Sequence, residues 1–346
     1  MTSKTIDNIV WFIPSRKLRD NIRDYMNFIY NKTNEINKPI RAWYRSFFIP
    51  FREDIKNDAN FYQKYLNLIK NLGKESVEIV IGILSKITNY NNIEDAIYFS
   101  RKESKRLNDL YEEFNNKIIK INEELFIYDK YILPENNFEL EAFYGKYGMD
   151  YVKNINQVKN KNIIDAGAYI GDSAILFSDY TDKNVYSFEP FLHHYNMILK
   201  TIELNKKNNI IPINMALGNE NKEISIYSNS DTANSGLSVE TKQSDINSFE
   251  NKVKMVTLDS YVKENNIEVE LIKTDLEGFE QPFLKGAIET IKEQKPVLII
   301  SIYHNYSDFF EIKPMIENLN LGYKFRIIRN KSPQLITETK LLAEVY

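Results

Sequence analysis

The sequence of 346 residues predicts an α/β protein in which a doubly wound, mostly parallel sheet follows a helical N-terminal region. In the C-terminal part, short apolar runs alternate with helical patterns, which favours parallel strands covered by helices on both faces. The last two runs have no helical pattern between them, so they predict an antiparallel hairpin that closes the sheet.

The strands are predicted from runs of branched apolar residues, and the helices from the segments between them. For the main sheet we expect seven strands, the last one antiparallel, at 162–165, 185–190, 210–217, 271–275, 296–304, 323–328 and 339–346. Helices are expected from Asp172, over Leu192–Asn205 and over Glu280–Glu293. The polar segment 218–251 carries one further predicted strand, Glu223–Tyr227.

The connection after the first strand has the composition of a turn that binds a nucleotide-type ligand. The strand ends at Asp165 and the helix begins near Asp172, and Gly167 and Gly171 between them permit a close backbone approach. The next strand leads to Glu189, whose carboxylate can accept hydrogen bonds from both hydroxyls of a ribose.

Tyr169 occupies the place of the second glycine in a dinucleotide-binding turn, which disfavours a pyrophosphate. A ligand with a ribose but no phosphate fits better, because Asp165 and Asp172 could then face a cation. S-adenosylmethionine (SAM), which carries a sulfonium and an ammonium, is the natural candidate. An NAD-type oxidoreductase is the less favoured alternative.

Four motifs in this order resemble the FkbM-type family of SAM-dependent methyltransferases. They are Asp165–Asp172, Phe188–Pro190, Thr257–Tyr261 and Leu271–Glu280, and Lys285–Ala287, Pro296 and Ile302–His304 also fall where that family has them. The similarity covers roughly Phe138–Tyr346. We therefore expect a methyltransferase domain over 138–346 and a separate helical domain over 1–137.

The resemblance implies a Rossmann-like methyltransferase sheet and methyl transfer from SAM to a hydroxyl, most often on a sugar. We expect a bacterial, cytoplasmic O-methyltransferase of cell-surface polysaccharide or glycan precursor biosynthesis. A SAM-binding interaction module without catalysis, within a glycan-assembly complex, is a second alternative. The expected cofactor-binding residues are Asp165, Gly167, Ala168, Tyr169, Gly171, Asp172, Ser173, Glu189, Pro190, Ala216 and Asp275.

Candidate catalytic residues lie where the parallel strands end, since ligands bind at that edge of an open sheet. Asp275 and His304 end neighbouring strands and could both reach one acceptor hydroxyl, and Glu277 follows on the turn. Lys273 shares a strand face with Asp275 and could orient either ligand. Glu280 is interpreted as a carboxylate that favours the helix N-terminus.

We predict no metal, although Asp275, Glu277 and Glu280 could offer oxygens to Mg²⁺. The absence of cysteine and of paired histidines at ligand spacing disfavours zinc. His193 and His194 are interpreted as residues of a surface helix. Asn234–Gly236 are expected in a loop on the acceptor side.

Composition and charge limit the classes of protein to which this chain could belong. The chain is 43% hydrophobic and 27% charged, which is typical of a soluble globular protein, and its net charge of -3 gives no reason to expect nucleic acid. We find no run of ~18 apolar residues and no signal peptide, so a cytoplasmic enzyme is the simple interpretation.

The N-terminal region is predicted to be helical. Ala59–Leu72 and Lys74–Ile87 read as two helices broken at Gly73. An a/d stripe indicates a helix that could mediate dimerisation, through Leu107, Tyr111, Phe114, Ile118, Ile121 and Leu125. The first fifty residues mix basic and aromatic side chains that could bind glycan or rest on an anionic membrane surface, such as Trp11, Arg16, Arg19, Arg41, Trp43 and Phe47.

Overall fold

A computed structural model of the chain describes residues 22–23, 26, 47–89, 101–228, 249–329 and 336–346. Most of the basic and aromatic residues of the first fifty, and the expected acceptor loop Asn234–Gly236, lie outside these ranges. The glycan or membrane contact assigned to the first group and the loop assigned to the second therefore stay predictions.

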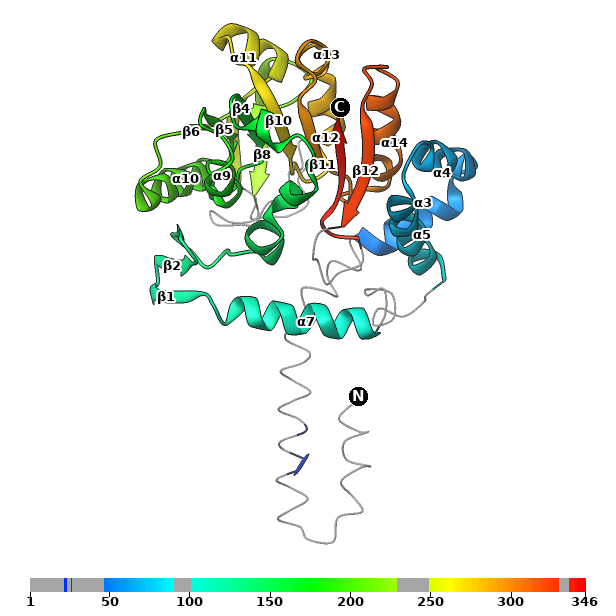
Figure 1. Cartoon of the computed structure of the whole chain (residues 1–346), viewed down its shortest axis with the longest axis horizontal. Coiled ribbons are helices and arrows are strands. Elements are labelled where there is room, and N and C mark those ends of the chain that lie inside the picture. Colours follow the sequence, from blue (N-terminus) through cyan, green and yellow to red (C-terminus); the bar gives the residue numbers. More distant parts are fainter. Residues whose placement is uncertain (1–21, 24–25, 27–46, 90–100, 229–248, 330–335) are drawn as a thin grey trace.

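The centre of the molecule is the predicted seven-stranded sheet, with strand order β12-β13-β11-β10-β4-β5-β6 (Figure 1). Its strands are β4 (Asn162–Ala166), β5 (Val185–Phe188), β6 (Ile210–Ile213), β10 (Val269–Thr274), β11 (Val297–Ser301), β12 (Lys324–Arg329) and β13 (Thr339–Glu344). Neighbours from β11 to β6 are parallel, whereas β13 runs antiparallel to both β11 and β12. The predicted closing hairpin is confirmed.

Both faces of this sheet are buried, which explains why its central strands read as continuous apolar runs. Successive side chains of a strand point to opposite faces. Ile164 and Ile272 therefore belong to one apolar core, and Ile163, Leu271 and Ile299 belong to another. A strand with two buried faces needs a cover on each side.

The C-terminal half supplies helices to both faces. They are α9 (Asp172–Phe177), α10 (Leu192–Asn205), α11 (Leu258–Asn265), α12 (Glu280–Lys285), α13 (Ile288–Gln294) and α14 (Tyr306–Glu317). A small second sheet, in the order β7-β9-β8, consists of β7 (Ala216–Leu217), β8 (Lys222–Ser228) and β9 (Phe249–Val256). None of the described helices is long and apolar enough to cross a lipid bilayer.

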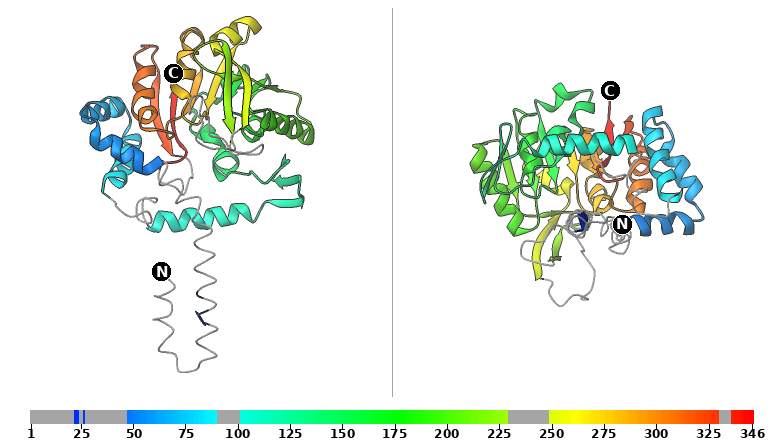
Figure 2. Two further views of the ribbon diagram at one scale, coloured as in Figure 1. Left: turned by 180° about the vertical axis from the view of Figure 1, so that it is seen from behind. Right: turned by 90° about the horizontal axis from the view of Figure 1, so that it is seen from below.

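The first described helices pack against one side of the sheet, as the views in Figures 1 and 2 show. They are α3 (Ile49–Asn57), α4 (Phe61–Ile69) and α5 (Lys74–Asn89), and the break at Gly73 is as predicted. Phe51 packs edge-on against Tyr306 and Phe309 of α14, and Ser76 of α5 exchanges hydrogen bonds with the backbone of Ile327. These helices therefore share the core of the sheet.

The predicted a/d helix is wrong beyond its first heptad, because the helix ends at Asn115. The helix α7 (Arg101–Asn115) ends at a pair of asparagines, and the chain then forms a three-stranded antiparallel sheet of β1 (Ile119–Asn122), β2 (Leu125–Tyr128) and β3 (Tyr131–Leu133). Branched residues at 118, 119 and 121 favour strand over helix, and the turn after Asn122 closes the hairpin. Dimerisation through α7 stays a prediction.

Short segments join β3 to β4, namely η2 (Leu140–Tyr144), η3 (Lys146–Tyr151) and α8 (Ile155–Val158). Phe138 and Phe143 pack against Tyr128 and Tyr131, and this aromatic group is continuous with the second core of the sheet. The division of the chain into domains at residue 137 stays a prediction.

Two predicted elements are each divided in two. The run 210–217 contains β6 and β7, because the chain turns at Asn214, whose side chain donates hydrogen bonds to the carbonyls of Glu189 and Pro190. The helix over 280–293 is interrupted at Gly286, where the backbone approaches Gly218 so closely that a Cβ atom would lie 1.9 Å from its carbonyl oxygen.

We expect Gly286→Ala to destabilise the protein by roughly 1–3 kcal/mol, because the added methyl group would force this backbone contact apart. The measurement is urea unfolding followed by circular dichroism. Gly73→Ala is the matched control, since a Cβ there meets nothing within 4 Å. Equal stability of the two variants would contradict the assigned contact.

Candidate active site

The turn between β4 and α9 brings the backbone of two strand ends together. Gly167 has φ of 80°, and a Cβ atom there would lie 2.0 Å from the carbonyl oxygen of Asp275. Gly171 has φ of 87° and precedes the first residue of α9. Both predicted glycines are therefore required. Gly171 is needed for its positive φ, and Gly167 for its positive φ and for its close contact with the Asp275 carbonyl.

Tyr169 lies at the centre of the turn in a left-handed conformation, with φ of 46°. Its backbone N–H donates a hydrogen bond of 3.0 Å to Glu189, and its hydroxyl donates one of 3.2 Å to Glu135. A non-glycine residue held in this region is strained, and such strain is concentrated at ligand sites. The amide that would face a pyrophosphate in a dinucleotide-binding turn is occupied by Glu189 instead.

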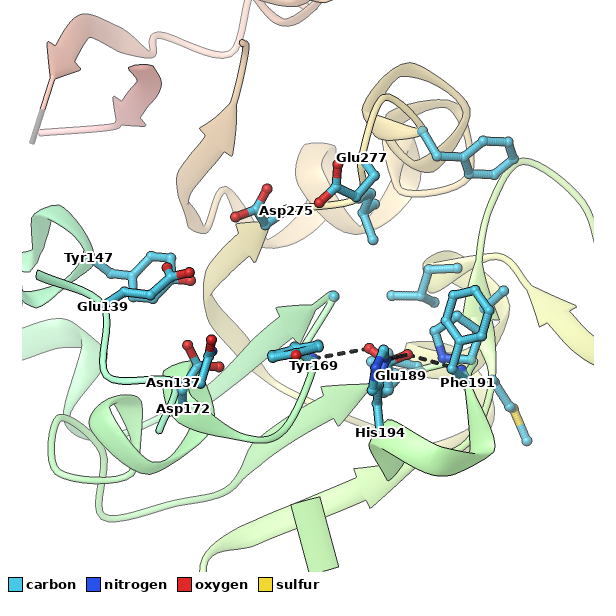
Figure 3. Close-up of a pocket in the computed structure, with 18 of the residues that line it drawn as sticks. Asn137, Glu139, Tyr147, Tyr169, Asp172, Glu189, Phe191, His194, Asp275 and Glu277 are labelled. Carbon is cyan, nitrogen blue, oxygen red and sulfur yellow. Dashed lines mark hydrogen bonds and ion pairs between the residues drawn. The ribbon is translucent and has the colours of Figure 1, made fainter. Parts of the chain in front are cut away.

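Glu189 follows β5 and is fixed by three groups, as Figure 3 shows. It accepts hydrogen bonds from the amides of Tyr169 and Phe191, and its Oε1 lies 3.5 Å from Nδ1 of His194. The carboxylate is 5% exposed and lines the pocket. It is held in one orientation at the position where the sequence predicts a ribose contact.

The interpretation of His194 as a surface residue is wrong, although His193 is exposed as predicted. His194 is buried, its ring packs edge-on at 4.5 Å from the ring of Tyr169, and it lines the pocket. The two side chains point about 100° apart around α10. The apolar pattern of that helix is too weak to show which one faces inward.

The pocket encloses about 250 Å³ at the carboxyl ends of β4, β5 and β10 and has two chemically different halves. One half is mainly apolar and is lined by Phe188, Pro190, Phe191, Met215, Ala216, Leu217, Ile224 and Phe279. The other half is polar and acidic and is lined by Asn137, Glu139, Tyr147, Asp172, Asp275, Glu277, Tyr303 and Glu338. Figure 3 shows Glu139, Tyr147, Asn137 and Asp172 together at one end.

Several of the residues expected to bind the cofactor are buried beneath the turn and do not line the pocket. They are Asp165, Ala168 and Ser173. The Ser173 hydroxyl donates to Asp165, and Nζ of Lys273 lies 3.0 Å from the same carboxylate and donates to the Gly167 carbonyl. Burial lowers the pKa of Lys273, but the charge of Asp165 outweighs it and the pKa is raised, so the ammonium persists.

His304 lies behind Asp275 and does not line the pocket. Its Nε2 is 3.1 Å from Asp275 and its Nδ1 is 2.9 Å from Glu280, which is fully buried. Burial would lower the pKa of His304, but Glu280 and Asp275 raise it well above its usual value. The ring is therefore an imidazolium held between two carboxylates.

Glu280 does more than favour a helix N-terminus, because it accepts hydrogen bonds from the amides of Leu276 and Gly278 as well as facing His304. It therefore fixes the turn after β10. Burial would raise the pKa of Asp275, but His304, Lys273 and Lys340 hold it below its usual range. Asp275 is thus a persistent carboxylate aimed into the pocket and a weak base.

Two other carboxyls of the pocket behave in the opposite way. Burial raises the pKa of Asp172 to about 7, with Asp165 adding to the effect and Lys273 opposing it. Glu139 is exposed and lines the pocket, where the surrounding protein removes part of its hydration. That desolvation, with the charges of Glu338, Asp172 and Asp275, holds the pKa of Glu139 well above its usual range.

Oxygen and nitrogen atoms of Asp275, Glu280 and His304 lie within 4.8 Å of one another, a spacing that could hold a metal ion. The two ring nitrogens, however, face different carboxylates at ion-pair distances. An imidazolium between two carboxylates accounts for this group without a metal.

Tyr303 belongs to the motif Ile302–His304, whereas Tyr147 and Glu338 come from segments that no sequence motif connects with a site. Tyr303 places its hydroxyl 3.2 Å from Asp275, and Glu338 pairs with the buried Lys340 at 3.0 Å. Tyr147 has φ of 51° and places its ring 4.3 Å from Lys340 Nζ. In the sequence, only Tyr303 and Glu338 lie beside strand ends, which is a weak signal of a site.

The strand order, the antiparallel β13 and a pocket at the strand ends define a Rossmann-like methyltransferase fold. The model of the Methyltransferase FkbM domain matches residues 165–325. This match agrees with the resemblance to the FkbM family that the sequence motifs predict. The matched range is narrower than the predicted 138–346.

Solved structures agree with this fold. A methyltransferase FkbM from Methylobacillus flagellatus has a TM-score of 0.52 at 17% identity, and the match covers 85% of this chain and 60% of that chain. Our chain thus spans less than two thirds of that protein.

Two further structures are more distant. A tRNA m1G37 methyltransferase of M. jannaschii has a TM-score of 0.35 at 17% identity over 65% of this chain and 57% of that chain. An rRNA methylase of Streptococcus thermophilus has a TM-score of 0.36 at 12% identity, and the match covers 61% of this chain and 99% of that chain. No curated protein sequence matches the chain.

The ionised state of His304 makes a prediction about pH. Because its pKa is raised in the folded protein, its stabilising contribution is complete below its unfolded pKa of about 6.5 and is lost as the pH rises through the folded pKa. The contribution of Asp275, whose pKa is lowered, stays constant there. Urea unfolding from pH 6 to 9 should therefore show a decline of up to about 1.4 kcal/mol per pH unit.

The decline should be smaller in His304→Gln, and smaller also in Glu280→Gln, which keeps the histidine but removes its main partner. His193→Gln is the matched control, since His193 is exposed, and should keep the wild-type slope. A wild-type slope in both His304→Gln and Glu280→Gln would refute the imidazolium assignment.

Proposed function

We propose that this protein is a SAM-dependent O-methyltransferase that acts on a sugar hydroxyl, within a cell-surface polysaccharide or a precursor of one. The match of residues 165–325 to the FkbM methyltransferase domain supports methyl transfer. The observation that carries the cofactor assignment is the fixed carboxylate of Glu189 between the two halves of the pocket.

The residues of the pocket fit the groups of this cofactor. The apolar half, with Phe191, Met215 and Leu217, suits an adenine ring, and Glu189 can accept hydrogen bonds from the ribose hydroxyls. Asp172 and Asp275 offer negative charge to the cationic groups. SAM, when bound, supplies an activated methyl group.

The same features disfavour NAD. The Tyr169 amide is occupied by Glu189, and Asp172 begins α9 at the place where a pyrophosphate would need a positive environment. A carboxylate there repels phosphate.

For the acceptor, Asp275 is the proposed orienting residue. Its ionised carboxylate can accept a hydrogen bond from the acceptor hydroxyl and align it, which is the main requirement of an in-line transfer. Because its pKa is low, the proton is better taken by a carboxyl nearer neutrality, such as Asp172. His304 is a positioning residue that keeps Asp275 charged, and Glu277 at the pocket edge can contact the acceptor.

Calorimetry with SAM, its demethylated product S-adenosylhomocysteine and NAD tests the cofactor. SAM and its product should bind, and Glu189→Ala should weaken both by about 10- to 100-fold, because it removes hydrogen bonds to a charged group worth about 1.5–3 kcal/mol. Glu264→Ala, on the exposed face of α11, should bind like the wild type. Binding of NAD alone would instead favour the oxidoreductase alternative.

A methyl-transfer assay tests the proposed role of Asp275 in orienting the acceptor hydroxyl. With radiolabelled SAM and a pool of glycan precursors, Asp275→Asn should lose more than about 100-fold in methyl transfer, since it removes the charge that orients the hydroxyl. Glu264→Asn is the surface control. If Asp275→Asn retains full turnover, Asp275 has no role in the transfer; if the wild type binds SAM but transfers nothing to any acceptor, the non-catalytic module is favoured.

A further inference from the structure

The acidic half of the pocket carries more negative charge than the surrounding side chains balance. Among the residues that the structure describes, six carboxylates line the pocket, Glu139, Asp172, Glu189, Asp275, Glu277 and Glu338, and no described lysine or arginine lines it. Glu189 belongs to the proposed ribose contact. The other five lie in the acidic half of the pocket.

The buried cations near this end are already paired. Nζ of Lys340 lies 2.7 Å from Glu141 and 3.0 Å from Glu338. His304 forms ion pairs with Asp275 and Glu280. Lys273 is paired with Asp165, which lies behind the turn. Within the described part of the chain, Glu139 and Asp172 form no ion pair with any lysine, arginine or histidine.

Asp172 is the more deeply buried of these two residues. Its side chain lines the pocket although the residue is only 4% exposed. A buried carboxylate without a cation is costly. Desolvation raises the pKa values of Asp172 and Glu139, and neighbouring carboxylates add to the effect, so a positive ligand in the pocket would be favoured.

The proposed cofactor leaves part of this charge unmatched. SAM carries two positive charges and one negative charge, so it adds only one net positive charge. Asp172, at the start of α9 beside the turn, is placed for the cofactor. Glu139 comes from another segment, between β3 and η2, and lies next to Tyr147 at the same end of the pocket as Asp172 (Figure 3).

A single metal ion is a poor match for the remaining carboxylates. In the described ranges, the one group of ligands close enough to hold an ion is Asp275, Glu280 and His304, which does not include Glu139, Asp172 or Glu338. The lining carboxylates are spread around a space, as suits a molecule that offers several hydrogen-bond donors at different points.

We infer that the acidic half of the pocket binds an acceptor that carries a protonated amine beside its hydroxyls, as an amino sugar does, with the ammonium against Glu139. This inference rests on the proposed methyltransferase function and specifies its substrate. Neighbouring hydroxyls donate to Glu338 and Asp275. Uronic acids and sugars with a phosphate at this end are repelled.

The charge state of the amine also decides which atom reacts. A protonated amine has no lone pair and cannot attack a methyl group, whereas a hydroxyl aligned by Asp275 can. The oxygen–carbon bond then forms as the sulfonium–carbon bond breaks, and the hydroxyl proton passes to a carboxylate. The ammonium therefore serves for recognition, and the product is an ether.

The test is calorimetric titration of the full chain saturated with S-adenosylhomocysteine. The probes are methyl glycosides of hexosamines, hexoses and hexuronic acids, each in the gluco, galacto and manno configurations. At least one hexosamine should bind about tenfold or more tighter than its matched hexose, because charge-assisted hydrogen bonds are roughly twice as strong as neutral ones. The uronides should not bind.

Glu139→Gln should remove the preference for the amine while leaving the affinity for S-adenosylhomocysteine within about twofold. Glu264→Gln, which removes an exposed carboxylate, should keep the preference. Cofactor binding and thermal unfolding report whether each variant is folded.

Equal affinity for the amine and the neutral sugar, or no binding of any hexosamine by a protein that binds the cofactor product, would overturn the inference. Hexosamine preference that survives Glu139→Gln would also overturn it. Failure of the wild type to bind S-adenosylhomocysteine would instead count against the proposed function, so the two failures are distinguishable.

Discussion

The candidate site depends on the close contact between the two turns that follow β4 and β10. The Gly167 backbone lies against the Asp275 carbonyl without room for a side chain, and the amide of Asp275 donates to the Ala166 carbonyl. Lys273 stabilises this contact, because its ammonium donates a hydrogen bond to the Gly167 carbonyl and forms an ion pair with Asp165. A buried lysine is costly alone, so its pairing with Asp165 is what makes the arrangement stable.

This contact fixes where the functional groups point. Because the β4 turn is held, the Tyr169 amide is aimed at Glu189, and the carboxylate is shared with the amide of Phe191. On the other side, the turn after β10 is held by Glu280, and His304 keeps Asp275 ionised. The two sides meet across one pocket, apolar at one end and acidic at the other.

The two turns use buried charge differently. On the β4 side a lysine compensates Asp165, and on the β10 side an imidazolium compensates Asp275 and Glu280. Glu139 and Asp172 form no ion pair with a cation of the described residues, and desolvation raises their pKa values. The protein thus keeps some carboxylates fixed and leaves others to respond to a ligand, which is the physical basis of the proposed preference for a cationic acceptor.

The sequence by itself determined the sheet, its antiparallel closure, the glycine turn and Glu189, because these depend on local periodicity and on short spacings along the chain. It could not place His194 and His304, since one residue of rotation on a helix or a strand end decides which way a ring faces. The end of α7 and the break at Gly286 were also decided by packing. Glu139, Tyr147 and Glu338 join the site through tertiary structure alone, because segments far apart in the chain converge at one edge of the sheet.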